Sequence, residues 1–388
     1  MPADSETTQQ DSTDSVTPYS VAGDVDYEKL LARFGADALT DDQRRRFPDH
    51  PIVRRGSFYA GRDVDAFLDG ETQSIVTGIG PSGPMHLGHA MVFYFAKRLQ
   101  ETFGARVYVP VSDDEKLWFK DQTADETSDY LDENLRDLLA VGFDPELTRI
   151  VVDTEDADVI YPLATAFARD ITNSTLEAVY GTPENAGQGF YPAVQTAHLV
   201  LPQLVHGAHE TLVPIAVDQD PHVRVSRDVA AKARYPVRKP GALLMQFLPS
   251  LGGPGKMSSS EGVAIRLTDD AETVRRNVRE HAYTGGRASV EEHREHGGDP
   301  EVDVPFQYLA AFFEPDDREL ARIERDYRRG DLLSGELKEL AADRIAAFLA
   351  DHQRRRDALG DVHEELAAYR LTEDERERAR AVVGFQRG

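Results

Sequence analysis

Four short apolar runs alternate with helical patterns in the middle of the chain. The runs are TQSIVTGIG (72–80), RVYVPVS (106–112), RIVVD (149–153) and TLVPIAVD (211–218), and each ends in polar or glycine residues. Between the first two runs, the spacing of apolar residues predicts a helix over HAMVFYFAKRLQETFG (89–104). Strands that alternate with helices predict a parallel sheet with crossover helices. Ligands of such sheets bind at the carboxyl ends of the strands, so functional residues are expected there.

Helical patterns dominate on both sides of this region. Before it, residues 24–36 carry apolar side chains at helical spacing, and Thr40 followed by Gln43 matches a helix capping box. Beyond it, the strand signals stop and residues 334–350 carry a single apolar stripe. This change of pattern places a domain boundary near 265–270.

The patterns predict an α/β fold class, with a Rossmann-type parallel sheet followed by an all-helical C-terminal domain. We expect four segments, which are a disordered acidic tail (1–15), an appended N-terminal segment (16–70), the Rossmann-type domain (71–267) and the helical domain (268–388). The tail is expected to be disordered because it is polar and acidic and has little apolar surface to bury.

The composition excludes several classes of protein. The chain has 388 residues and no cysteine, which excludes disulfides, cysteine-ligated zinc and a cysteine nucleophile. It has no apolar run of roughly 18 residues, so no membrane span is expected. The N-terminus lacks the basic and apolar regions of a signal peptide. We therefore expect a cytoplasmic protein.

The charge is unusual in both size and kind. The formal net charge is −25, and only eight of the 44 basic residues are lysines. An acidic chain argues against a nucleic-acid partner, because phosphate binding usually requires a basic face. Abundant acids with scarce lysine are instead typical of proteins from salt-loving cells, where the Debye length at molar salt is about 3 Å and self-repulsion costs little. We interpret the charge as salt adaptation, in preference to a binding role for the acidic surface.

The first candidate functional segment lies between the first strand and the helix, where residues 78–89 read GIGPSGPMHLGH. Small residues allow the backbone to approach a ligand closely, and the start of a helix offers free N–H groups to an anion. His86 and His89 lie one turn apart, where both can donate hydrogen bonds to phosphate oxygens. The alternative is a glycine-rich turn with two capping histidines.

The second candidate segment follows the last strand, where residues 255–260 read GKMSSS. Glycines and a proline precede it, which predicts a flexible loop. Lys256 is one of only eight lysines, and its presence in a composition that avoids lysine indicates a phosphate contact. The alternative is an ordinary surface loop.

Together, HLGH after the first strand and KMSSS after the last resemble the HIGH and KMSKS motifs of class I aminoacyl-tRNA synthetases. The order, separation and strand context of the two motifs fit that class. The resemblance implies that ATP binds at the helix start and that the lysine meets the leaving pyrophosphate. The implied catalytic residues are His86, His89 and Lys256. The implied ATP-binding residues are Gly78, Gly80, Pro81, Ser82, His86, Gly88, His89, Lys256, Met257, Ser258 and Ser260.

Further segments resemble tryptophanyl-tRNA synthetases of the archaeal and eukaryotic type. The resemblance extends from about Val16 to about Leu359. The segments that carry it are VTPY (16–19), DYEKLLARFG (26–35), RRGSFYAGRD (54–63), SDDEK (112–116), FYPAVQTA (190–197), AVDQDPH (216–222), HAYTGGRASVEEHREHGGDPEVDVPFQYL (281–309) and DYRRGDLLSGELK (326–338).

This resemblance implies an amino-acid site at the strand ends. Glu115, Gln195 and Gln219 are expected to hold the α-amino group, because a carboxylate and two amide oxygens suit an ammonium ion. Ala216 and Asp218 are expected to complete the site. The alternatives are a solvated acid at Glu115 and packing roles for the two glutamines.

Three positions depart from the family pattern. Val76 stands where a tyrosine often faces the indole, Pro110 where a glutamine is expected to bind the indole N–H, and Ile79 where the family has an arginine. A buried N–H without an acceptor costs roughly 1–3 kcal/mol. Either another group accepts the indole N–H, for which His198 and Gln195 are candidates, or the substrate is a different amino acid.

The resemblance implies that the chain charges tRNA(Trp) with L-tryptophan. The amino acid reacts with ATP to give an adenylate and pyrophosphate, and the adenylate then reacts with the tRNA and releases AMP. Mg²⁺ is expected to accompany the triphosphate, with no metal ligands from the protein. The helical domain is expected to bind the anticodon, and the enzyme is expected to be a homodimer. Arg354, Arg355 and Arg356 are candidates for a tRNA contact, the alternative being a solvated helix face.

Three other functions stay open on the sequence alone. Val76 and Pro110 leave room for a synthetase for tyrosine or another aromatic amino acid. A small-molecule nucleotidyltransferase shares the HxGH turn, but the long helical region after KMSSS argues against it. A non-catalytic paralogue is disfavoured by the presence of His86, His89, Glu115, Gln219 and Lys256.

The charge generates a first prediction. We expect the protein to lose stability below molar salt, because 69 acidic residues against 44 basic ones repel each other when screening is weak. The melting temperature in concentrated KCl should therefore lie well above that in dilute KCl. Equal melting temperatures would contradict the interpretation of the charge as salt adaptation.

Overall fold

The structure is a computed structural model that describes residues 16–17, 20–21, 31, 35–120, 122–256, 263–381 and 384. The expected acidic tail (1–15) lies outside the described residues, as does most of the helix expected over 24–36. The predicted strands and the predicted helical region after residue 268 are described almost completely.

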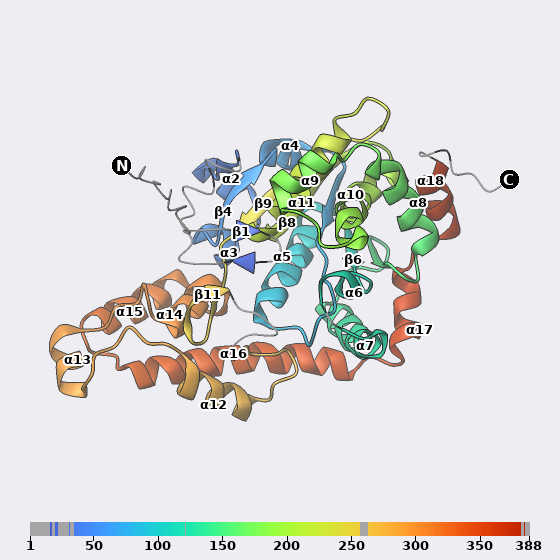
Figure 1. Cartoon of the computed structure of the whole chain (residues 1–388). Coiled ribbons are helices and arrows are strands. Elements are labelled where there is room, and N and C mark those ends of the chain that lie inside the picture. Colours follow the sequence, from blue (N-terminus) through green and yellow to red (C-terminus); the bar gives the residue numbers. More distant parts are fainter. Residues whose placement is uncertain are drawn as a thin grey trace, which may run out of the picture.

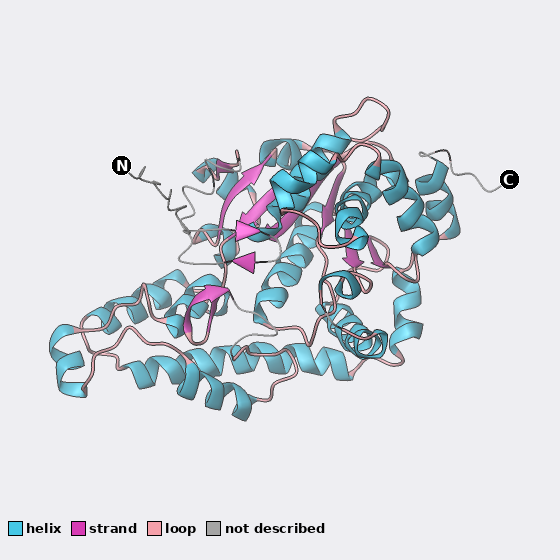
Figure 2. Cartoon of the chain, in the orientation of Figure 1, coloured by secondary structure: helices cyan, strands magenta, loops and turns pink. Residues whose placement is uncertain are grey.

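A seven-stranded sheet forms the centre of the α/β part (Figures 1 and 2). Its five strands from β9 to β7 are parallel, and β4 and β3 continue it as antiparallel strands at one edge. In spatial order the strands are β3 (Asp37–Ala38), β4 (Phe58–Arg62), β9 (Gly241–Met245), β8 (Glu210–Ala216), β5 (Gln73–Val76), β6 (Arg106–Val111) and β7 (Thr148–Val152).

All four predicted strands are present, as β5, β6, β7 and β8, and the predicted fold class is confirmed. The hydrophobic pattern does not predict β4 or β9, and glycines are the reason. A Cβ on Gly61 would lie 2.7 Å from the Ala242 carbonyl oxygen, and a Cβ on Gly241 would lie 2.8 Å from that of Arg62. Glycine here permits close approach of two backbones, whereas in the sequence it resembles a turn signal.

The sheet is covered on both faces, which explains why its strands are continuously apolar. Along β6, Val107 and Val109 face the core that contains α5 (Leu87–Phe103) and α7 (Ala124–Val141). Tyr108 faces the opposite core, with α8 (Ala157–Ala168) and α10 (Ala186–His206). The carboxyl ends of the parallel strands are therefore framed by helices on both sides.

The capping box expected at Thr40 is present at the start of a short helix, with Gln43 as its partner. No helix of the described chain is long and apolar enough to cross a membrane. The other helices are α2 (Asp41–Arg46), α3 (Pro51–Arg54), α4 (Val64–Asp69), α6 (Lys116–Phe119), α9 (Asn173–Tyr180), α11 (Asp220–Ala230), α12 (Ala271–His281), α13 (Val290–His296), α14 (Val304–Tyr308), α15 (Asp317–Arg328), α16 (Ser334–Asp357), α17 (Val362–Leu366) and α18 (Glu373–Ala381). The other elements are β1 (Val16–Thr17), β2 (Ser20–Val21), β10 (Pro249–Ser250), β11 (Gly253–Lys256), η1 (Val217–Gln219), η2 (Leu309–Phe313) and η3 (Ala367–Tyr369).

The helices from α12 to α16 form an elongated lobe beside the α/β part, and α16 runs along it toward α7 (Figure 1). The predicted stripe of α16 is confirmed, because Leu337, Ala341, Ile345 and Leu349 are buried. These side chains belong to the same apolar cluster as α5 and α7, so the lobe and the α/β part share one core. The expected boundary near 265–270 stays a prediction about separate domains.

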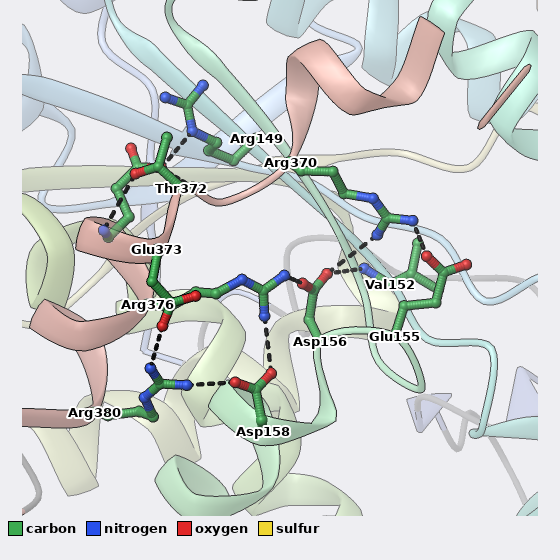
Figure 3. A network of polar contacts seen from close by, with 11 residues as sticks. Arg149, Val152, Glu155, Asp156, Asp158, Arg370, Thr372, Glu373, Arg376 and Arg380 are labelled. Atoms are coloured by element: carbon green, nitrogen blue, oxygen red, sulfur yellow. Dashed lines mark hydrogen bonds and ion pairs between the residues drawn. The ribbon is translucent and has the colours of Figure 1, made fainter. Parts of the chain in front are cut away.

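The last helix returns to the α/β part, where a network of ion pairs holds it (Figure 3). Asp156, which lies just after β7, is fully buried and accepts a hydrogen bond from the Val152 N–H at 2.9 Å. Arg376 of α18 pairs with both Asp156 and Asp158, and Arg370 approaches Asp156 Oδ2 at 3.4 Å. A buried carboxylate requires such partners, because it cannot be hydrated.

Removing Arg376 should therefore destabilise the protein. Arg376→Ala leaves the buried Asp156 carboxylate with the more distant Arg370 and the Val152 N–H, and we expect a loss of about 3 kcal/mol in the free energy of unfolding. Arg354→Ala is a matched control, since the exposed Arg354 pairs with the exposed Asp351 and should change stability by about 0.5 kcal/mol or less. Denaturant unfolding in concentrated KCl measures both values, and similar losses in the two variants would contradict the buried role of Arg376.

Candidate active site

The glycine-rich turn lies at the carboxyl ends of β5 and β6. The Ile79 N–H donates to the Pro110 carbonyl at 3.0 Å, and the Ser112 N–H donates to the Ile79 carbonyl at 2.9 Å. A Cβ on Gly78 would lie 2.3 Å from the Pro110 carbonyl oxygen. Glycine is therefore required at position 78 because the turn lies directly against β6.

The two histidines of HLGH lie at the start of α5. His86 is the N-cap, and its Nδ1 accepts from the Gly88 N–H at 3.1 Å. His89 Nδ1 accepts from the His86 N–H at 3.3 Å, and the two rings stack with centroids 3.8 Å apart. The capping arrangement that the sequence left as an alternative is thus present. It also places both imidazoles side by side at the positive end of a long helix, where an anion is favoured.

The chain after KMSSS returns to the HLGH turn. The Leu87 N–H donates to the Ile265 carbonyl at 3.1 Å, and the Leu267 N–H donates to the Met85 carbonyl at 3.0 Å. These bonds form a short antiparallel bridge between the HLGH turn and residues 265–267, which come shortly after KMSSS in the sequence. The bridge therefore fixes this later part of the chain at the start of α5.

Lys256 ends β11, the second strand of a hairpin with β10. The hairpin is held by the helical lobe, because the Tyr308 hydroxyl donates to the Pro249 carbonyl at 2.7 Å and the Tyr283 N–H donates to the Leu251 carbonyl at 2.7 Å. Met257, Ser258 and Ser260 lie outside the described residues. Their expected contacts with ATP stay predictions.

The expected amino-acid site is assembled from two strand ends and one helix. Glu115 follows β6, Ala216 ends β8, and Gln195 lies on α10. A Cβ on Gly80 would lie 2.2 Å from Glu115 Oε2, so this carboxylate lies against the glycine-rich turn. Glu115 also pairs with Lys116 at 2.9 Å. The structure therefore places the expected ammonium ligand beside the expected ATP site.

The two glutamines of this site are half-buried, and neighbouring oxygens orient them. Gln195 Nε2 donates to the Tyr191 hydroxyl at 2.6 Å, and Gln219 Nε2 donates to Asp218 Oδ2 at 3.2 Å. Asp218 itself is fully buried in η1. With the amide nitrogens engaged in this way, the amide oxygens are available to an ammonium group.

Four polar residues form a cluster, which are His198, Asp153, Asp114 and Tyr161. Of these, His198 and Asp114 are close in the sequence to the groups above. Only His198 was named as a candidate from the sequence. His198 Nε2 and Asp153 Oδ1 are 2.6 Å apart, and the Tyr161 hydroxyl donates to Asp114 Oδ2 at 2.5 Å. Burial and the neighbouring Asp153 raise the pKa of Asp114 to about 7. Burial lowers the pKa of His198, but the Asp153 carboxylate outweighs burial and brings it above its ordinary value. Asp114 and Asp153 could have been expected, because each follows a predicted strand.

The three arginines proposed for tRNA contact are engaged within the chain. Arg354 and Arg355 pair with Asp351, and Arg355 also donates to the Tyr94 hydroxyl at 2.5 Å. Arg356 pairs with Asp137 at 3.0 Å. Arg355 and Arg356 therefore hold α16 against the α/β part, which is neither of the roles considered from the sequence.

Two further features lie beside the two motifs, a pocket near HLGH and a hydrogen bond to the glycine-rich turn. A pocket of about 290 Å³ lies between the HLGH turn and α12, and it is lined in part by His86, Arg266 and Asp269. The Pro81 carbonyl, in the glycine-rich turn, accepts from Gln122 Nε2 at 3.1 Å.

Among the described residues, no group of three or more His, Asp or Glu side chains could hold a metal ion.

Comparisons with known proteins agree with this geometry. A family model described as tRNA synthetases class I (W and Y) matches residues 69–350. A tryptophan–tRNA ligase 2 of Halobacterium salinarum is 80% identical over 371 residues, which cover 95% of this chain and 98% of the relative. The tryptophan–tRNA ligase of Sulfolobus acidocaldarius is 42% identical, with 90% of this chain and 93% of the relative covered.

Solved structures are similar over the same length. The tryptophanyl-tRNA synthetase of Plasmodium falciparum superposes with a TM-score of 0.81 at 32% identity, with 92% of this chain and 99% of that chain covered. The enzyme from Aeropyrum pernix gives a TM-score of 0.79 at 31% identity, with 89% and 95% covered.

The packing of the glycine-rich turn yields a stability prediction. Gly78→Ala places a Cβ against the rigid Pro110 backbone, and we expect it to lower the free energy of unfolding by about 3 kcal/mol. Gly189→Ala on α10 is the control, since a Cβ there would lie 3.8 Å from its nearest neighbour, Pro183, and alanine favours the helix by about 0.5–1 kcal/mol. If thermal unfolding showed Gly78→Ala to be as stable as the original chain, the close approach of the turn to β6 would be wrong.

Proposed function

The chain belongs to the class I tRNA synthetases for tryptophan and tyrosine, and from this membership and its close relatives we infer that it is a tryptophan–tRNA ligase. The observation that carries the inference is the 80% identity to a tryptophan–tRNA ligase over 95% of the chain. That relative comes from Halobacterium salinarum, which supports a halophilic origin and explains the acidic composition. The substrates are ATP, L-tryptophan and tRNA(Trp).

In the first step, a carboxylate oxygen of tryptophan attacks the α-phosphorus of ATP. A bond forms between that oxygen and phosphorus, and the bond from phosphorus to the bridging oxygen breaks, releasing pyrophosphate. The carboxylate is already an adequate nucleophile, so the protein mainly positions the reactants and stabilises charge on phosphate oxygens. His86 and His89 are the residues proposed to contact these oxygens, and their stacking at the start of α5 supports this role.

In the same step, Lys256 and the serines of KMSSS are expected to follow the departing pyrophosphate. Lys256 ends a hairpin that the helical lobe holds, so its loop can close over the phosphates from that side. Mg²⁺ enters as part of the substrate, bound to the triphosphate and water. Charge on the pyrophosphate is then neutralised from two directions, by the helix start and by the lysine.

Glu115, Gln195 and Gln219 orient tryptophan through its ammonium group. All three are half-buried, at the rim of the strand ends. Glu115 lies against Gly80 of the ATP turn, so an ammonium bound to it leaves the adjacent carboxylate facing the phosphates. Ala216 and Asp218 form the neighbouring wall at the end of β8.

In the second step, a ribose hydroxyl of the terminal adenosine of the tRNA attacks the carbonyl carbon of the adenylate. The new ester bond replaces the bond to phosphate, and AMP leaves. The elongated helical lobe from α12 to α16 is the proposed anticodon-binding part. We also propose a homodimer that acts in the cytoplasm.

The proposed function is tested by amino-acid-dependent ATP–pyrophosphate exchange in concentrated KCl, with each of the twenty amino acids alone. Exchange with tryptophan only is the expected result. Exchange with tyrosine or phenylalanine would keep the family and overturn the specificity. Exchange with none, in protein shown to be folded, would indicate a non-catalytic paralogue.

A matched pair of lysine variants tests the role of KMSSS. Lys256→Ala should lower kcat for exchange by about a hundredfold to a thousandfold, because one charge that stabilises the transition state is removed. Lys232→Ala, at an exposed position after α11, should stay within about twofold of the original enzyme. Equal activity of the two variants would exclude Lys256 from the chemistry.

A further inference from the structure

Three buried polar atoms near the expected amino-acid site have no hydrogen-bond partner in the described structure. They are His198 Nδ1, Asp153 Oδ2 and Asp114 Oδ1. Their residues are almost fully buried, with relative exposures of 1%, 0% and 3%. A buried polar atom without a partner is costly, and it indicates that a ligand or water completes the site.

These residues lie directly beside those expected to hold the substrate ammonium. His198 follows Gln195 by three residues on α10, so the two side chains project from the same face of the helix. Asp114 immediately precedes Glu115 after β6. Gln195 and Glu115 are half-buried whereas His198 and Asp114 are buried, so the ammonium ligands form the rim of the site and the unpartnered atoms lie deeper. An amino acid held by its ammonium group at the rim would extend its side chain toward them.

Tryptophan brings a polar atom that must be satisfied when its side chain is buried. The indole N–H is a donor only and requires an acceptor. Val76 and Pro110, at the ends of β5 and β6, are buried and have no side-chain acceptor. Gln195 is already oriented by its hydrogen bond to the Tyr191 hydroxyl. The unpartnered atoms of the buried cluster therefore remain as acceptors for the indole.

Among these atoms, His198 Nδ1 matches the indole best. In a neutral imidazole one nitrogen is a donor and the other is an acceptor, and the bond made by the first decides which is which. His198 Nε2 lies 2.6 Å from Asp153 Oδ1, and a carboxylate can only accept. Asp153 thus fixes the proton on Nε2 and makes Nδ1 the acceptor. A neutral acceptor suits a neutral N–H, whereas a free buried carboxylate would instead attract the substrate ammonium.

We propose that His198 Nδ1 accepts the indole N–H of the bound tryptophan, and that Asp153 is the positioning residue that holds His198 in the required tautomer. This specificity determinant rests on the proposed function as a tryptophan–tRNA ligase. It provides a side-chain acceptor at the strand ends where Val76 and Pro110 offer none.

The test compares tryptophan with an analogue that has sulfur in place of the indole nitrogen, β-(benzothiophen-3-yl)alanine. The analogue has nearly the same shape and no N–H. In ATP–pyrophosphate exchange, the original enzyme should favour tryptophan by about tenfold to a hundredfold in kcat/KM, because the analogue leaves a buried acceptor unpaired. In His198→Leu this ratio should fall close to one, through a loss of tryptophan activity and not of analogue activity.

His206→Leu is the matched control. His206 lies on the same helix and also bonds through Nε2, to the Tyr108 hydroxyl at 3.0 Å, but it lies at the far end of α10. Its removal should leave the ratio between the two substrates unchanged. A ratio near one in the original enzyme, or an unchanged ratio in His198→Leu, would overturn the proposal.

A second measurement uses the unmodified enzyme, in case His198→Leu fails to fold. Protonated His198 offers only donors, so tryptophan must bind the neutral form. Asp153 brings the pKa of His198 above its ordinary value, so KM for tryptophan should rise as the pH falls from about 9 to about 6, while KM for the analogue changes less. Asp114 and His222 also interact electrostatically with His198, and Asp113 and Tyr161 interact with Asp114, but the titration of these groups affects both substrates and largely cancels in the ratio.

The outcomes separate this proposal from the function on which it rests. A ratio that does not fall on acidification would overturn the role of His198 while exchange with tryptophan still upholds the ligase. Absence of tryptophan-dependent exchange in folded protein would instead overturn the ligase function itself.

Discussion

Five neighbouring strands of the sheet run parallel, and the whole candidate site depends on this constraint. Parallel strands end at the same edge, so the residues after β5, β6, β7 and β8 meet there although they are separated in the sequence by crossover helices. The glycine-rich turn, Glu115, Asp153 and Asp218 are all such residues. Covering helices on both faces then leave this edge as the place where polar groups can gather around a ligand.

A second constraint is the use of charge in an acidic chain. The 69 acidic residues outnumber the 44 basic ones, and several arginines pair with buried carboxylates. Arg62 pairs with fully buried Asp220 at 2.9 Å, Arg376 pairs with fully buried Asp156, and Arg356 pairs with Asp137. Such pairs are screened by salt much less than exposed ones, so they can hold the helices together where surface pairs contribute little. Lysine is rare in the chain, which makes Lys256 in its glycine-rich hairpin more informative than a lysine usually is.

Some polar groups of the candidate site have hydrogen-bond partners in the described structure, and others have none. Around the HLGH turn, the histidine side chains and the bridge to residues 265–267 already satisfy the backbone, and they give a rigid start to α5. Deeper in the site, His198 Nδ1, Asp153 Oδ2 and Asp114 Oδ1 remain without partners in the described structure. A rigid frame with unpaired polar atoms inside it is suited to recognise a substrate that supplies the missing groups.

The sequence by itself determined the elements and the chemistry. Apolar runs predicted four of the five parallel strands, the stripe over 334–350 predicted the core face of α16, and HLGH with KMSSS indicated the class I synthetase family. Only the tertiary structure decided which groups meet. The sequence pattern did not predict β4 and β9, because Gly61 and Gly241 resemble turn signals. Their role is to let two strands approach closely, and this role depends on the neighbouring strand, which the local sequence does not show. The Tyr94 hydroxyl that accepts from Arg355 lies 261 residues away in the chain, and the Asp153 carboxylate bonded to His198 lies 45 residues away. Local patterns report spacing along one segment, whereas contacts between distant segments follow from how the helices and the sheet pack.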